Sequence, residues 1–191
     1  MPLVGDGPGP ALPGHLEGAV SFISQTQDLR HAFDLMLRRL ASEDLAPLGF
    51  RCSGHTLSRD RGDHVQHFQF QGSQGNQPDA ACAWYLNCGI DLPGIPMSLR
   101  RRVAAAHPSW WGWAPHILWA SRAEGLVPQL PDRWVIDHAT DLDAMRSRLA
   151  EVLPAASHAL DQRSRQLRRE LWLFRLMAPL GRMLGPARDR T

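Results

Sequence analysis

Alternating hydrophobic and polar residues predict two β-strands, at residues 64–71 and 81–90. Side chains alternate between the two faces of a strand, so the large apolar residues of both strands share one face. These apolar residues are Phe68, Phe70, Trp84 and Leu86. The polar residues of the opposite face are His67, Gln69, Gln71, Tyr85 and Asn87. We therefore expect a sheet with one apolar face, directed into the core, and one polar face, directed to solvent.

Three further strands are expected around this pair. Residues 50–59 are predicted to pair with residues 64–71 as a hairpin, through the polar turn at residues 60–63. Two short strands are predicted at residues 117–122 and 133–138. The antiparallel hairpin pattern favours a sheet built from neighbours in the chain.

Helical spacing appears on both sides of the predicted sheet. Apolar residues recur at steps of three and four between Leu29 and Leu40, which predicts an amphipathic helix. This helix should end near Ala46, because Pro47 disfavours helical geometry in the residue before it. A second helix is expected to open at Asp141, with Thr140 or Asp141 as its N-terminal cap.

The C-terminal part is predicted to hold a separate helix. Pro154 is expected to interrupt the helix that opens at Asp141. The final helix carries apolar residues on one stripe, and from Leu171 onward it is apolar nearly all round. Such a segment must dock on its own domain, on another subunit or on a membrane surface. We favour self-association, which makes a homodimer through this helix the expected assembly.

Together these elements predict an α+β fold, in which an antiparallel sheet of four to five strands packs against an N-terminal helix and C-terminal helices. Gly and Pro crowd the first 14 residues, which predicts a flexible leader. The expected organisation is a leader at residues 1–20, an α+β domain at residues 21–160, and a C-terminal helix and tail at residues 161–191.

The order of these signals resembles a known family. The motifs that carry the resemblance are Leu48-Gly49-Phe50, Phe68-Gln69-Phe70-Gln71, Leu86-Asn87-Cys88-Gly89-Ile90 and Asp132-Arg133-Trp134. In this order and spacing they resemble the DUF4304 family of small bacterial proteins, over roughly Leu29 to Leu160. The resemblance implies an α+β domain. Some such domains are thought to lie near bacterial toxin or defence genes, which implies a binding role of immunity or accessory type.

Composition favours one folded domain over a membrane protein or a polycationic nucleic-acid binder. The chain has 191 residues, of which 43% are hydrophobic, and 21 basic against 19 acidic residues give a net charge of +2. No apolar run reaches the roughly 18 residues that a membrane span needs. Residues 1–14 lack the cationic start and apolar core of a signal peptide. We expect a cytoplasmic location.

Cysteines and histidines do not predict a metal site, a cofactor or a catalytic residue. Cys52, Cys82 and Cys88 form no CxxC pair, so neither a disulfide framework nor a zinc site is indicated. Two of them lie on the apolar strand face, as buried hydrophobic residues do. His64 and His67 lie three apart on a strand and point to opposite faces, so they cannot chelate one ion unless the strand is bulged there.

The polar sheet face is the first candidate for function. Its candidate binding residues are His67, Gln69, Tyr85, Asn87 and Arg122. Amide groups both donate and accept hydrogen bonds, which suits recognition of a peptide or a polar small molecule. The same face could serve an enzyme that acts on a small polar substrate. It could also be the ordinary solvated side of an antiparallel sheet.

A cluster of tryptophan and arginine residues is the second candidate. Trp110, Trp111 and Trp113 follow three consecutive arginines at residues 100–102. Trp and Arg are enriched at protein interface hot spots, and they also stack on the bases of single-stranded nucleic acid. Alternatively, the tryptophans fill the core or cover one end of the sheet.

The sequence thus predicts a non-enzymatic protein-binding module of immunity or accessory type, without a cofactor. Two alternatives stay open. One is an enzyme that uses the polar face, and the other is a nucleic-acid binder built on Arg and Trp, whose affinity would fall steeply with salt.

Overall fold

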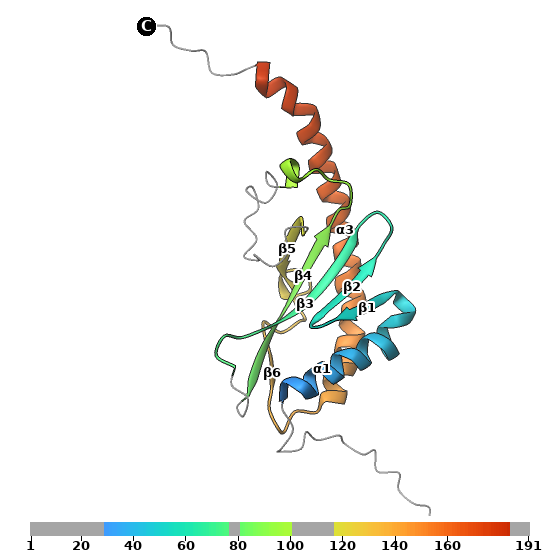
Figure 1. Ribbon diagram of the computed structural model, residues 1–191, viewed down its shortest axis with the longest axis vertical. Helices are drawn as coiled ribbons and strands as arrows, with labels where there is room; N and C mark the ends of the chain where they lie inside the picture. The colour runs from blue at the N-terminus through green and yellow to red at the C-terminus, as the bar shows by residue number, and fades with distance from the viewer. Residues whose placement is uncertain (1–28, 77–80, 101–116, 184–191) are drawn as a thin grey trace, which may run out of the picture.

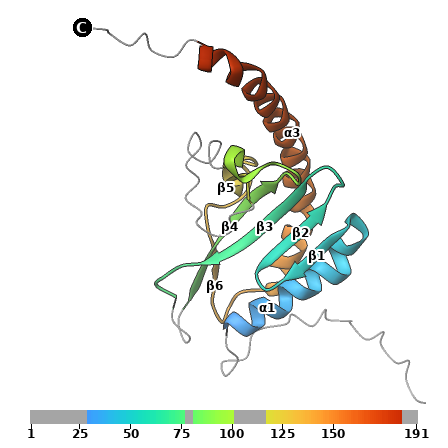
Figure 2. The same cartoon turned by 45° about the horizontal axis from the view of Figure 1, so that its top comes forward.

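The structure, a computed structural model, describes residues 29–76, 81–100 and 117–183, with side chains as far as residue 173. Its strands form one antiparallel sheet, and the helices α1 (Leu29–Arg39) and α3 (Leu142–Met183) pack against the same face of it (Figure 1). We call the opposite face, which neither α1 nor α3 covers, the open face (Figure 2). The predicted α+β fold is confirmed.

Six strands make up the sheet: β1 (Phe50–Ser53), β2 (Thr56–Asp60), β3 (Val65–Gly72), β4 (Cys82–Asp91), β5 (Trp119–Arg122) and β6 (Trp134–Ile136). They follow the order β1-β2-β3-β4-β5, and β6 also pairs with β4. The long β4 accommodates both partners, because Asn87 lies opposite Arg122 of β5 and Trp84 lies opposite Trp134 of β6. Between β5 and β6 the chain leaves the sheet through the short helix η3 (Ala123–Gly125).

The strand predicted at residues 50–59 is in fact two strands. The chain turns at Gly54, whose φ of 55° lies in the left-handed region that favours glycine, and β1 folds back on β2 with Ser53 opposite Thr56. The sheet therefore has one strand more than the upper number expected. The strands predicted at 64–71, 81–90, 117–122 and 133–138 all occur, with shifted ends.

The N-terminal helix is confirmed, but its last turns change type. After α1 the chain forms the π-helix η1 (Leu40–Leu45) and the 3₁₀-helix η2 (Ala46–Leu48). Gly49, with φ of 85°, closes the helical stretch and donates its N–H to the carbonyl of Ala46. The helical path thus ends two residues later than Pro47 led us to expect.

The predicted break at Pro154 is wrong, because α3 is one helix of 42 residues. A proline inside a helix removes one hydrogen bond, at a cost of about 3 kcal/mol. Leu153 and Ala156, on either side of Pro154, are fully buried. A continuous helix is favoured because it keeps both of them packed in the core. The C-terminal part of α3 extends beyond the sheet (Figure 1).

The hydrophobic core lies between the sheet and the two helices. At one end Phe33 of α1 stacks on Trp84, with ring centroids 4.4 Å apart, and meets Phe70 edge to face at 5.4 Å. Phe68, Phe70, Trp84 and Leu86 are all buried on this side, as the alternation predicts. None of the helices in the described part of the chain is long and apolar enough to cross a membrane.

Ion pairs fasten the end of the N-terminal helical stretch to the start of α3. Arg146 of α3 contacts Glu43, and its Nε lies 3.6 Å from Asp44. Arg39 contacts Glu43 at 3.3 Å. The hydrogen bond from Arg146 is the main cause that holds the pKa of Glu43 below its ordinary value of 4.5.

Replacing Glu43 by Gln is expected to flatten the acid side of the stability profile. Because the folded-state pKa of Glu43 is depressed, its contribution is complete above pH 4.5 and is lost as the pH falls through the folded pKa. Urea unfolding at a series of pH values should therefore show the wild type approaching the Glu43→Gln variant only below pH 4.5. A difference that stays constant with pH would contradict this role.

Candidate functional site

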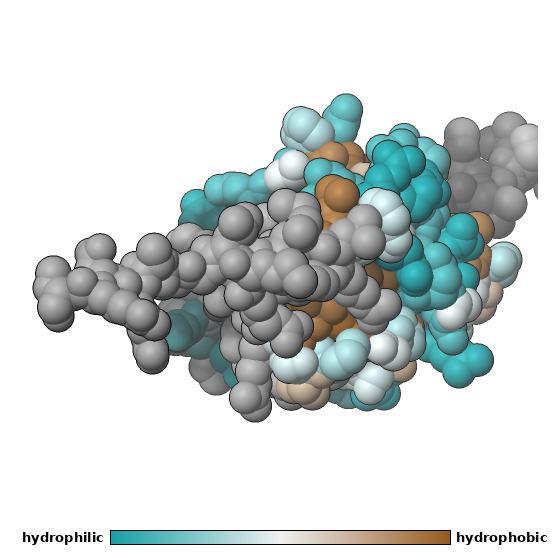
Figure 3. Space-filling model, turned by 90° about the horizontal axis from the view of Figure 1, so that it is seen from above, coloured by the Kyte–Doolittle hydropathy of each residue, from teal (hydrophilic) through white to brown (hydrophobic). Residues whose placement is uncertain are grey.

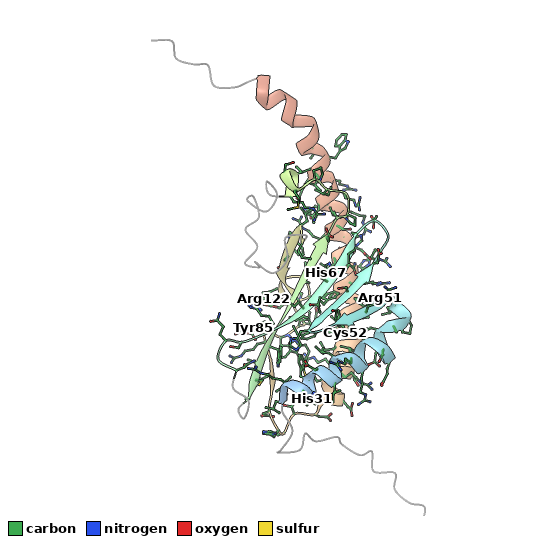
Figure 4. All side chains as sticks on the ribbon, viewed as in Figure 1. His31, Arg51, Cys52, His67, Tyr85 and Arg122 are labelled. Atoms are coloured by element: carbon green, nitrogen blue, oxygen red, sulfur yellow. The ribbon has the colours of Figure 1, made fainter. Side chains whose placement is uncertain are left out.

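The open face is crossed by rows of side chains that strand pairing places side by side. One row runs through Ser53, Thr56, Gln69, Asn87 and Arg122. The next row on one side runs through Arg51, Ser58, His67, Gly89 and Ala120. On the other side Gln71 pairs with Tyr85. The five candidate binding residues of the polar sheet face therefore do share one face of the sheet. Figure 4 labels three of them, His67, Tyr85 and Arg122.

Four of these open-face side chains contact one another through hydrogen bonds and one cation–π contact, and we call them the Arg122 cluster: Gln71, Tyr85, Asn87 and Arg122. The guanidinium carbon of Arg122 lies 4.2 Å from the centroid of the Tyr85 ring. Arg122 Nη1 donates to Asn87 Oδ1 at 2.9 Å. Asn87 Nδ2 in turn donates to Gln71 Oε1 at 3.2 Å. A cation is thus held on the sheet by stacking and by a chain of amides.

The Asn87 side chain departs from the prediction in one respect. It points to the open face as expected, but it is fully buried rather than directed to water. Its burial is compensated because its oxygen accepts from Arg122 and its nitrogen donates to Gln71. Asn87 therefore supports Arg122 from below and is not itself a surface contact.

The remaining predicted residues of the polar face lie beside the cluster. His67 Nδ1 lies 3.0 Å from the hydroxyl of Ser58, and Gln69 lies directly across the strand pair from Asn87. Both are half-buried. Gln71, which the sequence also places on the polar face, joins the binding candidates through its contact with Asn87. Its hydrogen bond with Asn87, diagonally across the strand pair, depends on the strand register, which the period of two alone does not determine.

The tryptophan candidates Trp110, Trp111 and Trp113 lie outside the described residues. Arg100, which precedes them, is used within the domain: its Nη1 contacts Asp91 at 2.7 Å, and its Nε and Nη2 donate to the carbonyls of Ile95 and Leu92. Arg100 thus ties the turn after β4 to the end of that strand.

Burial opposes nucleophilic chemistry at Cys52 and Cys88. Burial raises the pKa of the Cys88 thiol to about 12. Cys82 is buried as predicted, and burial also raises the pKa of Cys52. A nucleophilic cysteine needs the opposite shift. Within the described residues, no group of three metal-ligating side chains could hold an ion.

A second polar cluster lies on the core side of the sheet and was not predicted. His64 is buried between two carboxylates, with Nδ1 2.6 Å from Asp63 and Nε2 3.1 Å from Asp161. Gln66 is fully buried and donates to Asp161 at 2.7 Å and to the carbonyl of Ser157 at 2.9 Å. We call these residues the Asp161 cluster. The signal in the sequence was Gln66, which shares its strand face with two phenylalanines.

The Asp161 cluster joins the β2–β3 hairpin to α3. Arg61 donates from two nitrogens to the carboxylate of Asp161, at 3.3 and 3.2 Å. The Ser157 hydroxyl donates to Gln66 Oε1 and accepts from Arg59. These groups bind one another across the helix–sheet interface, so we assign the cluster a structural role.

Comparison with known proteins identifies a family but not a function. The model of the family described as "Domain of unknown function (DUF4304)" matches residues 41–161, which is more than half of the chain. The match spans all six strands and the Arg122 cluster. No curated protein and no solved structure matches.

Proposed function

The chain belongs to the DUF4304 family of domains of unknown function, and we propose that it is a non-enzymatic protein-binding module whose binding surface is the open face. The observation that carries this proposal is the Arg122 cluster, because it holds an arginine in a fixed position on a sheet face that neither helix covers. Arg and Tyr are among the residues enriched at interface hot spots.

The rigidity of the cluster supports binding. An arginine that is already held by Tyr85 and Asn87 loses little conformational freedom when a partner docks. The enzyme alternative would require a general acid or base beside the substrate. Among the residues of that alternative, His67 is the titratable one that would act as acid or base. Its Nδ1 is engaged by the hydroxyl of Ser58 within the sheet. The hydrogen bonds in the cluster serve to position a cation, which favours recognition.

Within this class we propose an immunity or accessory role in the bacterial cytoplasm. Its support is the association with toxin or defence genes that the family resemblance implies. The nucleic-acid alternative has less support, because Arg100, one of its arginines, contacts Asp91 at 2.7 Å.

The proposal is tested by removing side chains from the centre of the open face. We expect that His67→Ala with Gln69→Ala will weaken binding of a partner captured from the native host by about tenfold or more. The matched control is Glu151→Ala with His158→Ala, which truncates two exposed residues of α3. Affinities are measured by calorimetry with the purified partner. Capture of no stoichiometric partner, or equal affinity for both double variants, would reject the proposal.

The role of the tryptophans stays a prediction. If Trp110 and Trp111 contribute to the same interface, Trp110→Ala with Trp111→Ala will weaken partner binding and leave the folded fraction unchanged. A change in stability without a change in binding would assign them to packing instead.

Self-association through the C-terminal helix also stays a prediction. Trp172 and Leu173 are 61% and 53% exposed on the part of α3 that extends past the sheet. Seen from that end, hydrophobic residues show at the surface next to hydrophilic ones (Figure 3). Sedimentation equilibrium should show a dimer that Trp172→Glu dissociates and Arg165→Glu, on the same helix, does not. A monomeric wild type would contradict the homodimer.

A further inference from the structure

We infer that the Arg122 cluster is a carboxylate-recognition site, at which an acidic side chain of the partner protein docks. This inference rests on the proposed function and specifies the chemistry of the partner. It follows from the direction of the hydrogen bonds in the cluster and from the charges on the open face.

Arg122 determines the orientation of both amides in the cluster. A guanidinium can only donate hydrogen bonds, so the group of Asn87 that contacts it must be the oxygen. Asn87 then has its nitrogen toward Gln71, and the group of Gln71 that meets it must again be the oxygen. The amide nitrogen of Gln71, which carries two donors, is consequently directed away from Asn87.

The cluster therefore ends on donors at the protein surface. Gln71 is exposed, and its NH₂ group is directed away from Asn87, while Arg122 lies over the ring of Tyr85, the strand partner of Gln71. A ligand that matches this arrangement must supply acceptors and negative charge. A carboxylate does both, and hydrogen bonds between a carboxylate and charged donors are among the strongest in proteins.

Charges on the open face have the sign that attracts such a ligand. The rows through the middle of the face contain Arg51 and Arg122, and their described positions contain neither Asp nor Glu. Among the strand residues that the structure describes on this face, Asp60 and Asp91 are acidic; both lie opposite Val65 at the far end of the sheet, and Asp91 contacts Arg100. The face is thus complementary to an acidic segment.

An acidic protein segment fits better than nucleic acid. Nucleic-acid affinity comes mainly from many phosphate contacts by basic residues, whereas the chain has a net charge of only +2. The planar fork of a guanidinium instead matches a carboxylate, which it binds by two parallel hydrogen bonds. We therefore commit to a carboxylate and treat nucleic acid as an outcome of the test.

The test is a titration of the full chain with defined probes. Binding is monitored through the NMR signals of the Asn and Gln side-chain amides. The first probe is a glutamate-rich peptide with both ends blocked. The second is the same peptide with Gln for Glu and a free C-terminal carboxylate, and the third is single-stranded oligo-dT. We expect the glutamate peptide to shift the Gln71 and Asn87 amides to saturation. Binding of the Gln peptide alone would instead identify a C-terminal carboxylate as the ligand, which would overturn an acidic side chain.

Variants decide whether the cluster is responsible. Arg122→Gln should lower the affinity for the glutamate peptide by about tenfold to hundredfold. Gln71→Glu should lower the affinity for the glutamate peptide by a similar factor. One carboxylate oxygen of the new side chain still accepts from Asn87, while the other replaces the NH₂ donors of Gln71 with a negative charge. Arg122→Lys should give an intermediate loss, and Arg165→Gln, which removes an exposed charge of α3, should give none. Equal losses for Arg122→Gln and Arg165→Gln, or stronger binding of oligo-dT than of the peptide, would overturn the inference.

Failure of this inference is distinguishable from failure of the proposed function. If Arg122→Gln leaves the affinity for the captured partner unchanged while His67→Ala with Gln69→Ala lowers it, the open face binds a partner and the carboxylate assignment is wrong. If neither variant affects partner binding, the open face is not the binding surface.

Discussion

Replacing Phe33 by Ala is expected to lower the free energy of unfolding by about 4 kcal/mol, because truncating a buried phenylalanine removes its burial and leaves a cavity. Phe33 is fully buried, stacks on Trp84 at 4.4 Å and meets Phe70 at 5.4 Å, so it joins α1 to two strands. Urea denaturation followed by circular dichroism measures the effect.

The matched control for Phe33 is Leu35 on the same helix. Its side chain is 40% exposed, so Leu35→Ala should cost less than about 1 kcal/mol. Similar losses for the two variants would mean that α1 does not pack through Phe33 as described.

A second large effect is expected at the Asp161 cluster. Asp161→Ala should cost about 3 kcal/mol, because it leaves His64 and Gln66 buried without the carboxylate that both contact. It also removes two hydrogen bonds from Arg61. Urea unfolding at neutral pH is again the measurement, and it reports directly on the attachment of the β2–β3 hairpin to α3.

Asp143, another carboxylate of α3, provides the comparison for Asp161. It is 43% exposed and contacts Arg39 at 3.3 Å, which is the geometry of an ordinary surface ion pair. Such pairs contribute about 0–1 kcal/mol, so Asp143→Ala should have a small effect. A loss at Asp161 no larger than that at Asp143 would show that the buried cluster does not hold the hairpin.

Local patterns predicted the parts of the fold that local geometry determines. The period of two placed Phe68 and Phe70 inside because side-chain alternation needs no knowledge of the rest of the chain. The turn at Gly54 was missed, since a lone glycine within an apolar and polar alternation is compatible with a continuous strand. The continuity of α3 through Pro154 depends on tertiary burial of the flanking residues, which no local rule contains.

The candidate site was predicted as a face and not as a cluster. Alternation placed Tyr85 and Asn87 on the polar side, but the register that sets Arg122 opposite Asn87 joins residues 35 positions apart. The same register explains why Asn87 is buried and not exposed. In the second cluster, strand periodicity marks Gln66 as a polar residue on the apolar face, but it cannot identify Asp161 as a partner, because Asp161 comes from the helix.

Tyr85 offers the most direct test of a binding surface at the Arg122 cluster, because it is the one tyrosine in the chain. Nitration with tetranitromethane therefore reports on this position alone, and mass spectrometry measures its rate with and without the purified partner. The account predicts that partner binding slows nitration of Tyr85 in the wild type, and that Arg122→Gln needs a higher partner concentration for the same protection. Unchanged nitration under conditions in which the partner is fully bound would contradict it.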